Sequence, residues 1–299
     1  MRKGFPNDVT VLSPGTLLHV RLERVGAGIK PERTRVHRMS PGVFGSGVQT
    51  PPLADPEGLR QGILRMKNEA GDFSSVSVLL PDSWFRMNIL EIKQLPERPS
   101  EADEMVRWTL RRTLPANQDE LRIAWQLIEK SSSMNRVLVL GAAESTLEQI
   151  ESVFAAEQIQ VCLIEPVGLN IWNLLSDHEG DDGADRVFFY FRNGEFTTGL
   201  FRGAIPLFVR SRALSGERSV IQELKLSASY LRGKAQLNGI KRCWVAGSSL
   251  ERWIIDAVHD EFRADVEILR LEDLAISPSS IDVEGFDAEI AGCLGVFSS

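Results

Sequence analysis

Residues Val76 to Pro115 read VSVLLPDSWFRMNILEIKQLPERPSEADEMVRWTLRRTLP, and they contain two strand patterns followed by one helix pattern. The apolar run Val76–Leu80 is closed by a proline, which cannot donate to a sheet. A second alternating run, Phe85–Ile92, precedes a charged helix whose predicted N-cap is Ser100. Pro115 ends this helix, because proline cannot continue it. The order strand, strand, helix indicates an α/β protein.

The composition is that of an ordinary globular protein and excludes several classes. The chain has 299 residues, 43% of them hydrophobic and 25% charged, which is enough to bury a stable core. A net charge of −7 gives no general attraction to nucleic acid or anionic lipid. Three isolated cysteines, Cys162, Cys243 and Cys293, indicate reduced core thiols and a cytoplasmic protein. No signal peptide or membrane span is expected, so membrane association would come only through a partner.

One pattern of elements occurs twice along the chain. Each copy has three short strands joined by turns, then a helix, a strand and a further helix. The turn signals are Ser13-Pro14-Gly15 in the first copy and Asn193-Gly194 in the second, the latter a strong hairpin signal. The predicted strands are 9–12, 17–22, 33–38, 187–191, 196–201, 205–209, 243–246 and 266–269. The predicted helices of the two copies are 55–67, 219–232, one containing Ile254, Val258 and Phe262, and 286–297.

Residues 76–164 lie between the copies and have a pattern of their own. Beyond the opening stretch they contain predicted strands at 123–128, 137–140 and 161–164, with a helix at 145–154. Pro166 then opens a helix over 167–175 at a position where its missing N–H costs nothing. A pair of ferredoxin-like domains is the alternative fold, but it explains the middle of the chain and not the repeated strands.

The opening stretch resembles the corresponding region of the PilM family, cytoplasmic actin-like proteins of type IV pilus assembly. The resemblance also extends to the cytoplasmic domain of GspL and to FtsA. It implies an actin-like (ribonuclease H-like, duplicated) α/β fold with an inserted small α+β module. The halves would be residues 1–75 with 165–180, and 185–299, and the inserted partner-binding module would be 76–164. The features that carry the resemblance are Leu80-Pro81, Arg86, Leu95-Pro96, Glu101, Glu104, Trp108 and Leu114-Pro115.

Actin-like ATPases hold Mg²⁺ and phosphates between two hairpin turns, each entered through an Asp-x-Gly strand end, and this chain lacks that pattern. The first turn aligns with Ser13-Pro14-Gly15, which keeps Gly15 but has a hydroxyl in place of the carboxylate. The second aligns with Tyr190-Phe191-Arg192, where tyrosine and arginine replace Asp and Gly, and no carboxylate follows until Glu195 beyond the hairpin tip. Both metal-binding carboxylates are missing, so we expect no ATP hydrolysis.

The motif that would approach the adenosine is weakened rather than lost. It reads Gly247-Ser248-Ser249, so the degenerate cleft would consist of Gly15, Gly247, Ser248 and Ser249. We therefore expect no cofactor; ATP with Mg remains the alternative. The acidic run 177–185 lacks the spacing of a calcium loop, and the four histidines are scattered, so no metal site is expected.

Aromatic and basic residues crowd the inserted module, where core packing and partner binding are both open interpretations. In PilM-like proteins a groove beside this module receives the N-terminal tail of PilN, an inner-membrane protein. Similarity would place such a tail here as an extended strand, with pilus motor or platform proteins as further partners. The residues expected to line the groove are Trp84, Phe85, Arg86, Trp108 and Arg112.

The resulting hypothesis is a non-catalytic cytoplasmic adaptor, held at the inner membrane through its partner. Two rival functions remain open. One is an actin-like ATPase that binds Mg-ATP and cycles between partners. The other is a filament-forming protein like FtsA, which the tail 289–299 does not favour because it is too short and uncharged to bind a membrane.

Overall fold

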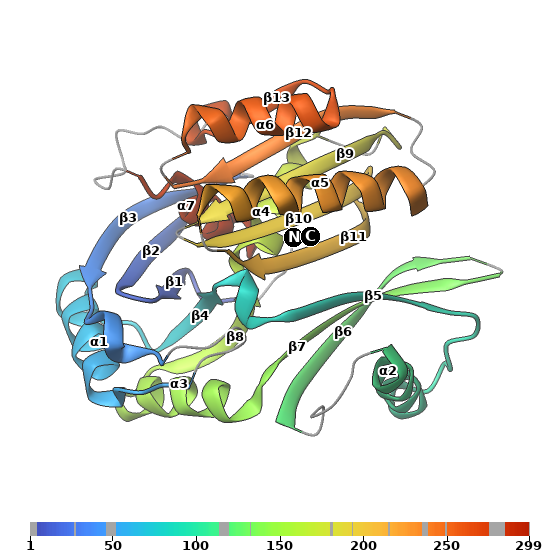
Figure 1. Ribbon diagram of the computed structural model, residues 1–299. Coiled ribbons are helices and arrows are strands. Elements are labelled where there is room, and N and C mark those ends of the chain that lie inside the picture. Colours follow the sequence, from blue (N-terminus) through green and yellow to red (C-terminus); the bar gives the residue numbers. More distant parts are fainter. Residues whose placement is uncertain are drawn as a thin grey trace.

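A computed structural model shows two five-stranded sheets of identical strand order, with a smaller sheet attached to the first (Figure 1). The order is β3-β2-β1-β4-β8 in the first half and β11-β10-β9-β12-β13 in the second. The duplication predicted from the sequence is therefore confirmed. The structure describes residues 5–26, 28–45, 52–113, 120–131, 133–179, 182–192, 194–214, 216–234, 239–248, 250–274 and 285–298.

The first half is built on an antiparallel three-stranded hairpin arrangement continued by two parallel strands. Asp55 caps helix α1, where its side chain accepts the Gly58 N–H at 2.9 Å, and Pro56 occupies the first helical position. The elements of this half are β1 (Asp8–Ser13), β2 (Thr16–Val25), β3 (Gly28–Arg38), the 3₁₀ turn Pro41–Val43, α1 (Pro56–Ala70), β4 (Ser75–Leu80), α3 (Glu144–Ala156), β8 (Gln160–Pro166) and α4 (Val167–Glu179).

The second half repeats this plan without an insertion. Its outer face is covered by α5 and α6, whose apolar residues pack with the phenylalanines of β9 and β10. Its elements are β9 (Asp185–Arg192), β10 (Glu195–Arg202), β11 (Ile205–Ala213), α5 (Glu217–Lys234), β12 (Ile240–Gly247), α6 (Arg252–Phe262), β13 (Val266–Ile268), the 3₁₀ turn Leu271–Leu274 and α7 (Asp287–Gly295).

Helices α4 and α7 form a central layer between the two sheets. One core cluster joins them to β1 and β2 of the first half and to β9 and β12 of the second. The two helices approach closely, because a Cβ on Gly295 would lie only 1.8 Å from the backbone oxygen of Asn170. The glycine therefore lets the backbones meet, and this contact fixes how the two halves lie against each other.

The inserted module comprises the 3₁₀ turn Asp82–Trp84, β5 (Arg86–Ile92), α2 (Pro99–Thr113), β6 (Leu121–Lys130) and β7 (Asn135–Ala143). It is narrower than the predicted 76–164, because β4 and β8 pair with each other in the first half's sheet. Helix α2 begins at Pro99, so Ser100 lies inside the helix and the predicted N-cap is wrong. The predicted end at Pro115 lies outside the described residues.

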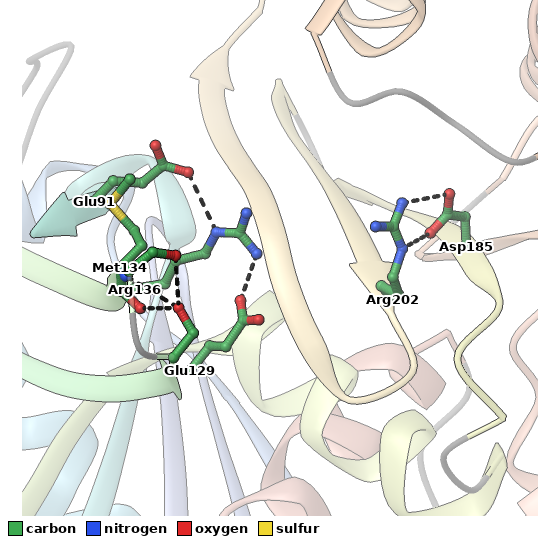
Figure 2. A network of polar contacts seen from close by, with 8 residues as sticks. Glu91, Glu129, Met134, Arg136, Asp185 and Arg202 are labelled. Carbon is green, nitrogen blue, oxygen red and sulfur yellow. Dashed lines mark hydrogen bonds and ion pairs between the residues drawn. The ribbon is translucent and has the colours of Figure 1, made fainter. Parts of the chain in front are cut away.

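The module forms an antiparallel sheet of order β5-β7-β6, and α2 covers one of its faces. Its hairpin carries an ion-paired group in which Arg136 contacts both Glu91 and Glu129 (Figure 2). The second half carries the pair Arg202–Asp185, with Nε and Oδ1 2.7 Å apart. This pair, together with the charge of Glu129, raises the pKa of Arg202. The second half also meets the module directly through β11 and β5.

The three cysteines are free thiols, but they are not alike. Burial raises the pKa of Cys243 to about 12 and that of Cys293 well above its ordinary value, so both are core thiols. Cys162 is exposed on β8, so the prediction that it is a core thiol is wrong. Among the described residues, no helix combines the length and apolar character needed to cross a bilayer.

Candidate functional site

The two halves meet at a cleft formed by equivalent hairpin turns, β1–β2 and β9–β10. A cavity of about 320 Å³ lies there, with walls from both halves and from the start of α7. Its lining residues are Ser13, Pro14, Thr16, Pro81, Arg192, Glu195, Ser248, Gly285, Phe286 and Glu289. The two sequence segments aligned with phosphate-binding turns are therefore brought together, as predicted.

The first turn has the expected hairpin geometry but few donors for an anion. Gly15 has φ +82°, a conformation that glycine adopts without strain. Pro14 has no N–H, and the Ser13 and Thr16 hydroxyls lie 2.6 Å apart, bonded to each other. His19, the next basic residue along β2, is fully buried, and its Nε2 lies 2.9 Å from Asp8 Oδ1. This turn presents one hydroxyl pair and no ammonium group.

Arg192 fills the second turn and spans the cleft. Its Nη2 donates to Ser13 Oγ at 2.8 Å, although the two residues are 179 positions apart in the sequence. Its Nη1 lies 3.1 Å from Glu289 Oε1, in an ion pair whose side chains are 9% and 1% exposed. The hydroxyl of Tyr190 donates to the same carboxylate at 3.4 Å. A single guanidinium thus connects the first half, the second half and the central helix α7.

Two further carboxyl groups lie beside Arg192, and sequence reasoning missed their place in the cleft. Asp82 is fully buried, and its Oδ1 accepts the Gly168 N–H at the start of α4 at 2.7 Å. Glu195 follows the hairpin tip, as the sequence indicated, and it also lines the cavity, where its Oε1 accepts the Ser83 hydroxyl at 2.8 Å. Burial raises the pKa of Asp82 to about 6 and that of Glu195 to about 7.

The third predicted motif has a structural role as well as a place in the cleft. A Cβ on Gly247 would lie 2.1 Å from the Phe191 carbonyl oxygen, so glycine is required for the pairing of β12 with β9. Ser248 lines the cavity, and Ser249 lies outside the described residues. Gly15, Gly247 and Ser248 therefore gather around one cleft, although Gly247 acts by allowing close packing.

The polar side chains of this cleft already have partners within the protein. Arg192 contacts Ser13 and Glu289, while the carboxyl groups of Asp82 and Glu195 accept from Gly168 and Ser83. Across the described part of the chain, no three His, Cys, Asp or Glu residues are arranged to hold a metal ion. In the acidic run, Asp182 pairs with Arg186 and Lys241, and Asp185 pairs with Arg202.

A second candidate site is a groove between the inserted module and the main body. Two cavities, of about 360 and 230 Å³, share Ala124 and Leu140 in their walls. The larger is lined by β6 and β7, by α4 residues that include Trp172, and by residues 204–206 at the start of β11. The smaller lies between the module, α3 and β8, and includes Phe85 and Cys162. Together they mark a groove that runs along one face of the module.

Two sheet edges and one ionic bridge border this groove. Strand β8 is the last strand of the first half's sheet, and β6 is the last strand of the small sheet. Edge strands present backbone N–H and C=O groups that can pair with an added strand. Arg122 on β6 crosses to α3, where it contacts Glu144 at 2.6 Å and also Glu151. The groove therefore offers strand pairing, apolar walls and one charged bridge.

The predicted partner-binding residues are not all at this groove. Phe85 lines the smaller cavity, whereas Trp84 is buried with its ring centroid 4.7 Å from that of Phe44. Arg86 is half-buried at the start of β5 and lines neither cavity. Trp108 is 57% exposed on α2, and the Arg112 guanidinium lies 4.9 Å from its ring centroid. Because α2 covers the opposite face of the module's sheet, this pair lies away from the groove.

Comparison with known proteins gives structural likenesses. No protein-family model matches the sequence, and no curated protein matches it. A chain of the PilM–PilN type IV pilus biogenesis complex is similar at TM-score 0.80 and 17% identity, with 96% of each chain covered. A protein of unknown function from Bacteroides thetaiotaomicron, described as having an actin-like ATPase fold, gives TM-score 0.58 and 10% identity over 91% of this chain and 92% of its own.

A third solved structure is the cytoplasmic domain of EpsL, an inner membrane component of the type II secretion system of Vibrio cholerae. It has 11% identity and TM-score 0.47, over 85% of this chain and 93% of its own. The duplicated sheets, the central helix pair and the first two likenesses show that this chain has the actin-like ATPase fold with a small antiparallel insertion, as its resemblance to PilM implied.

Proposed function

We propose that this chain is a non-catalytic adaptor of a type IV pilus or related secretion platform. It binds the extended N-terminal tail of a PilN-like inner-membrane protein in the groove beside the inserted module. The observation that carries this proposal is the groove itself, which two edge strands border and apolar side chains line. The similar solved structure is a PilM–PilN complex, which supports a partner of the same kind.

The groove suits an extended peptide for physical reasons. A peptide added to an edge strand gains backbone hydrogen bonds, and alternate side chains then point toward the groove floor. The apolar part of that floor consists of Leu138, Leu140, Leu169 and Ile205, from three different parts of the chain, beside polar residues such as Asn173. A tail with alternating aliphatic residues fits these walls. On this proposal the adaptor works in the cytoplasm and reaches the membrane only through its partner.

Replacing Ala124 by arginine is expected to weaken tail binding strongly. Ala124 is exposed and lines both cavities, so the new side chain fills the groove without entering the core. We expect affinity to fall roughly 100-fold, equivalent to about 2.7 kcal/mol. Stability should change by no more than about 0.5 kcal/mol, as is usual at surface positions. The measurement is titration calorimetry with a synthetic peptide that has the N-terminal sequence of a PilN-like inner-membrane protein.

Two further variants make this experiment decisive. Gln222→Arg adds the same charge at an exposed position of α5, far from the groove, and should leave the affinity unchanged. Trp108→Ala tests the alternative surface on α2. Loss of binding in Trp108→Ala together with normal binding in Ala124→Arg would place the tail on α2 and contradict the groove assignment.

We propose in addition that the cleft between the halves does not bind Mg-ATP. The arginine that crosses it and the carboxyl groups beside it support this view. Titration with Mg-ATP up to about 1 mM should give no saturable heat, which excludes binding stronger than about −4 kcal/mol. The same sample should bind the tail peptide, which shows that the protein is active. Saturable heat with ATP would instead favour the ATPase that cycles between partners.

A further inference from the structure

The contacts of Arg192 are those of a bridge between the two halves. One nitrogen donates to Ser13 on the first half's hairpin, and another pairs with Glu289 on α7. Arg192 itself ends β9 of the second half, opposite Glu195 in the β9–β10 register. Ser13, Arg192 and Glu289 come from three segments that are far apart in the sequence. The Arg192 guanidinium contacts both of the other side chains.

The bridge lies where a ligand of an actin-like protein would join the halves. Both hairpin turns face the same cavity, and in an ATP-binding cleft the phosphates would contact both turns at once. Here a covalent part of the chain makes that connection. A bound ligand can shift an equilibrium between open and closed forms only through different affinity for the two. A side chain that already joins the turns removes the need for such a ligand.

The position of the halves also affects the partner groove. The larger cavity is lined by the module and α4 of the first half, but also by Ala204, Ile205 and Pro206 of the second half. Ala204 lies in the β10–β11 turn and Ile205 and Pro206 begin β11, at the far end of the strand β10 that starts near Arg192. Any rotation of the second half would therefore move one wall of the groove.

We propose that Arg192 is a built-in bridge that holds the two halves closed without nucleotide and thereby fixes the width of the partner groove. The part that concerns the groove rests on the proposed function, whereas the closure of the halves does not. Because Arg192 holds the two halves in the closed arrangement, no nucleotide is needed to close them. The affinity for the tail therefore does not depend on whether nucleotide is bound.

The closure can be measured as a distance between spin labels on the outer helices. Glu57→Cys on α1 and Asp256→Cys on α6 provide label sites whose native side chains are 61% and 65% exposed. A Cys162→Ser background removes the exposed native thiol, while Cys243 and Cys293 are buried. We expect one narrow distance distribution that Mg-ATP leaves unchanged. Arg192→Ala should add a longer-distance population, and it should weaken tail-peptide binding roughly ten-fold, a typical coupling between sites.

Control variants separate the bridge from a general loss of stability. Arg210→Ala removes a half-buried ion pair with Glu223 that lies within the second half, and it should leave the distribution narrow. Ser13→Ala removes the bond between the hairpins and the local contact with Thr16, but it keeps the Arg192–Glu289 pair, so it should give a smaller longer-distance population than Arg192→Ala. It also keeps the test open if Arg192→Ala does not fold.

The possible outcomes distinguish the two proposals. A distance distribution that stays narrow in Arg192→Ala and in Ser13→Ala would overturn the bridge, regardless of the affinity for the tail peptide. A broadened distribution with unchanged tail affinity would overturn its effect on the groove. If the unmodified chain does not bind the tail, the proposed adaptor function fails, and the distance measurement still decides whether Arg192 closes the cleft.

Discussion

The variant Gly295→Ala is expected to destabilise the folded chain by about 3 kcal/mol or more. The added Cβ would lie 1.8 Å from the backbone oxygen of Asn170 and 2.5 Å from its carbonyl carbon. Both atoms belong to the backbone of α4, so no side-chain rotation can relieve the overlap. Helices α4 and α7 would have to separate, which disturbs the core cluster shared by both sheets. Such a loss is large against the 5–15 kcal/mol typical of folded proteins.

Denaturant unfolding of the purified variant gives this free energy, with Gly233→Ala as the matched control. Gly233 lies near the end of α5, and a Cβ there would meet no atom within 4 Å. Alanine in that position should leave stability unchanged or raise it by up to about 1 kcal/mol. Equal unfolding free energies for Gly295→Ala and the unmodified chain would show that α4 and α7 are not in close backbone contact.

A second large effect is expected from pH, because two buried carboxyl groups hold protons that the unfolded chain releases. Burial raises the pKa of Asp82 from 3.8 to about 6 and that of Glu195 from 4.5 to about 7. Folding therefore takes up protons in this range, and the free energy of unfolding falls as the pH rises from about 4 to 7. A shift of about two pH units corresponds to about 3 kcal/mol for a fully buried group.

The double variant Asp82→Asn with Glu195→Gln should remove this pH dependence. Both amides keep an oxygen that can accept from Gly168 and from Ser83. Because both shifted groups are removed, we expect the difference in unfolding free energy between this variant and the unmodified chain to change by about 5 kcal/mol between pH 4.5 and 8. His37, whose pKa burial lowers, acts in the opposite direction but is common to both proteins.

Urea unfolding at a series of pH values provides the measurement, and Asp182→Asn provides the control. Hydrogen bonds from Arg186 and Lys241 hold the pKa of Asp182 well below its usual value, so it does not titrate in this window. That variant should keep the slope of the unmodified chain. Parallel curves for the double variant and the unmodified chain would mean that Asp82 and Glu195 are ionised in the fold throughout the range.

The sequence predicted the duplicated halves well because their signals are local. Alternating apolar strands, hairpin glycines and amphipathic helices recur in the same order, and each is readable within about ten residues. The limits of the insertion could not be read in this way. An apolar strand such as Val76–Leu80 has the same pattern in either sheet, and only the pairing of β4 with β8 assigns both to the first half.

The residues of the cleft were predictable only in part. The two turns and Gly247 carry local signals, so their meeting at one cavity followed from the fold. Asp82 and Glu289 carry none, because their importance comes from the long-range contacts of η2 (Asp82–Trp84) and α7 with the central layer. Glu195 follows the hairpin tip as its place in the sequence indicated, but its position in the cavity wall depends on the fold and could not be read from the sequence.

The helix α2 shows how periodicity could have refined the choice of partner-binding residues. Val106 and Leu110 are buried, and they share a face because they are four positions apart. Trp108 lies halfway between them, which places it on the opposite, exposed side. The sequence therefore indicated that Trp108 faces away from the module's sheet. It did not indicate where a groove would form, because that depends on β8, α4 and β11 together.

The place of α7 in the centre of the molecule has a consequence for synthesis on the ribosome. The inner face of the first sheet packs against α7, yet Asp8–Ser13 emerges long before Asp287–Gly295. At about 5–20 residues per second, tens of seconds pass between the synthesis of β1 and that of α7. During that interval the part of this apolar face that α7 packs against in the folded protein is exposed, and it is covered only after α7 has been translated.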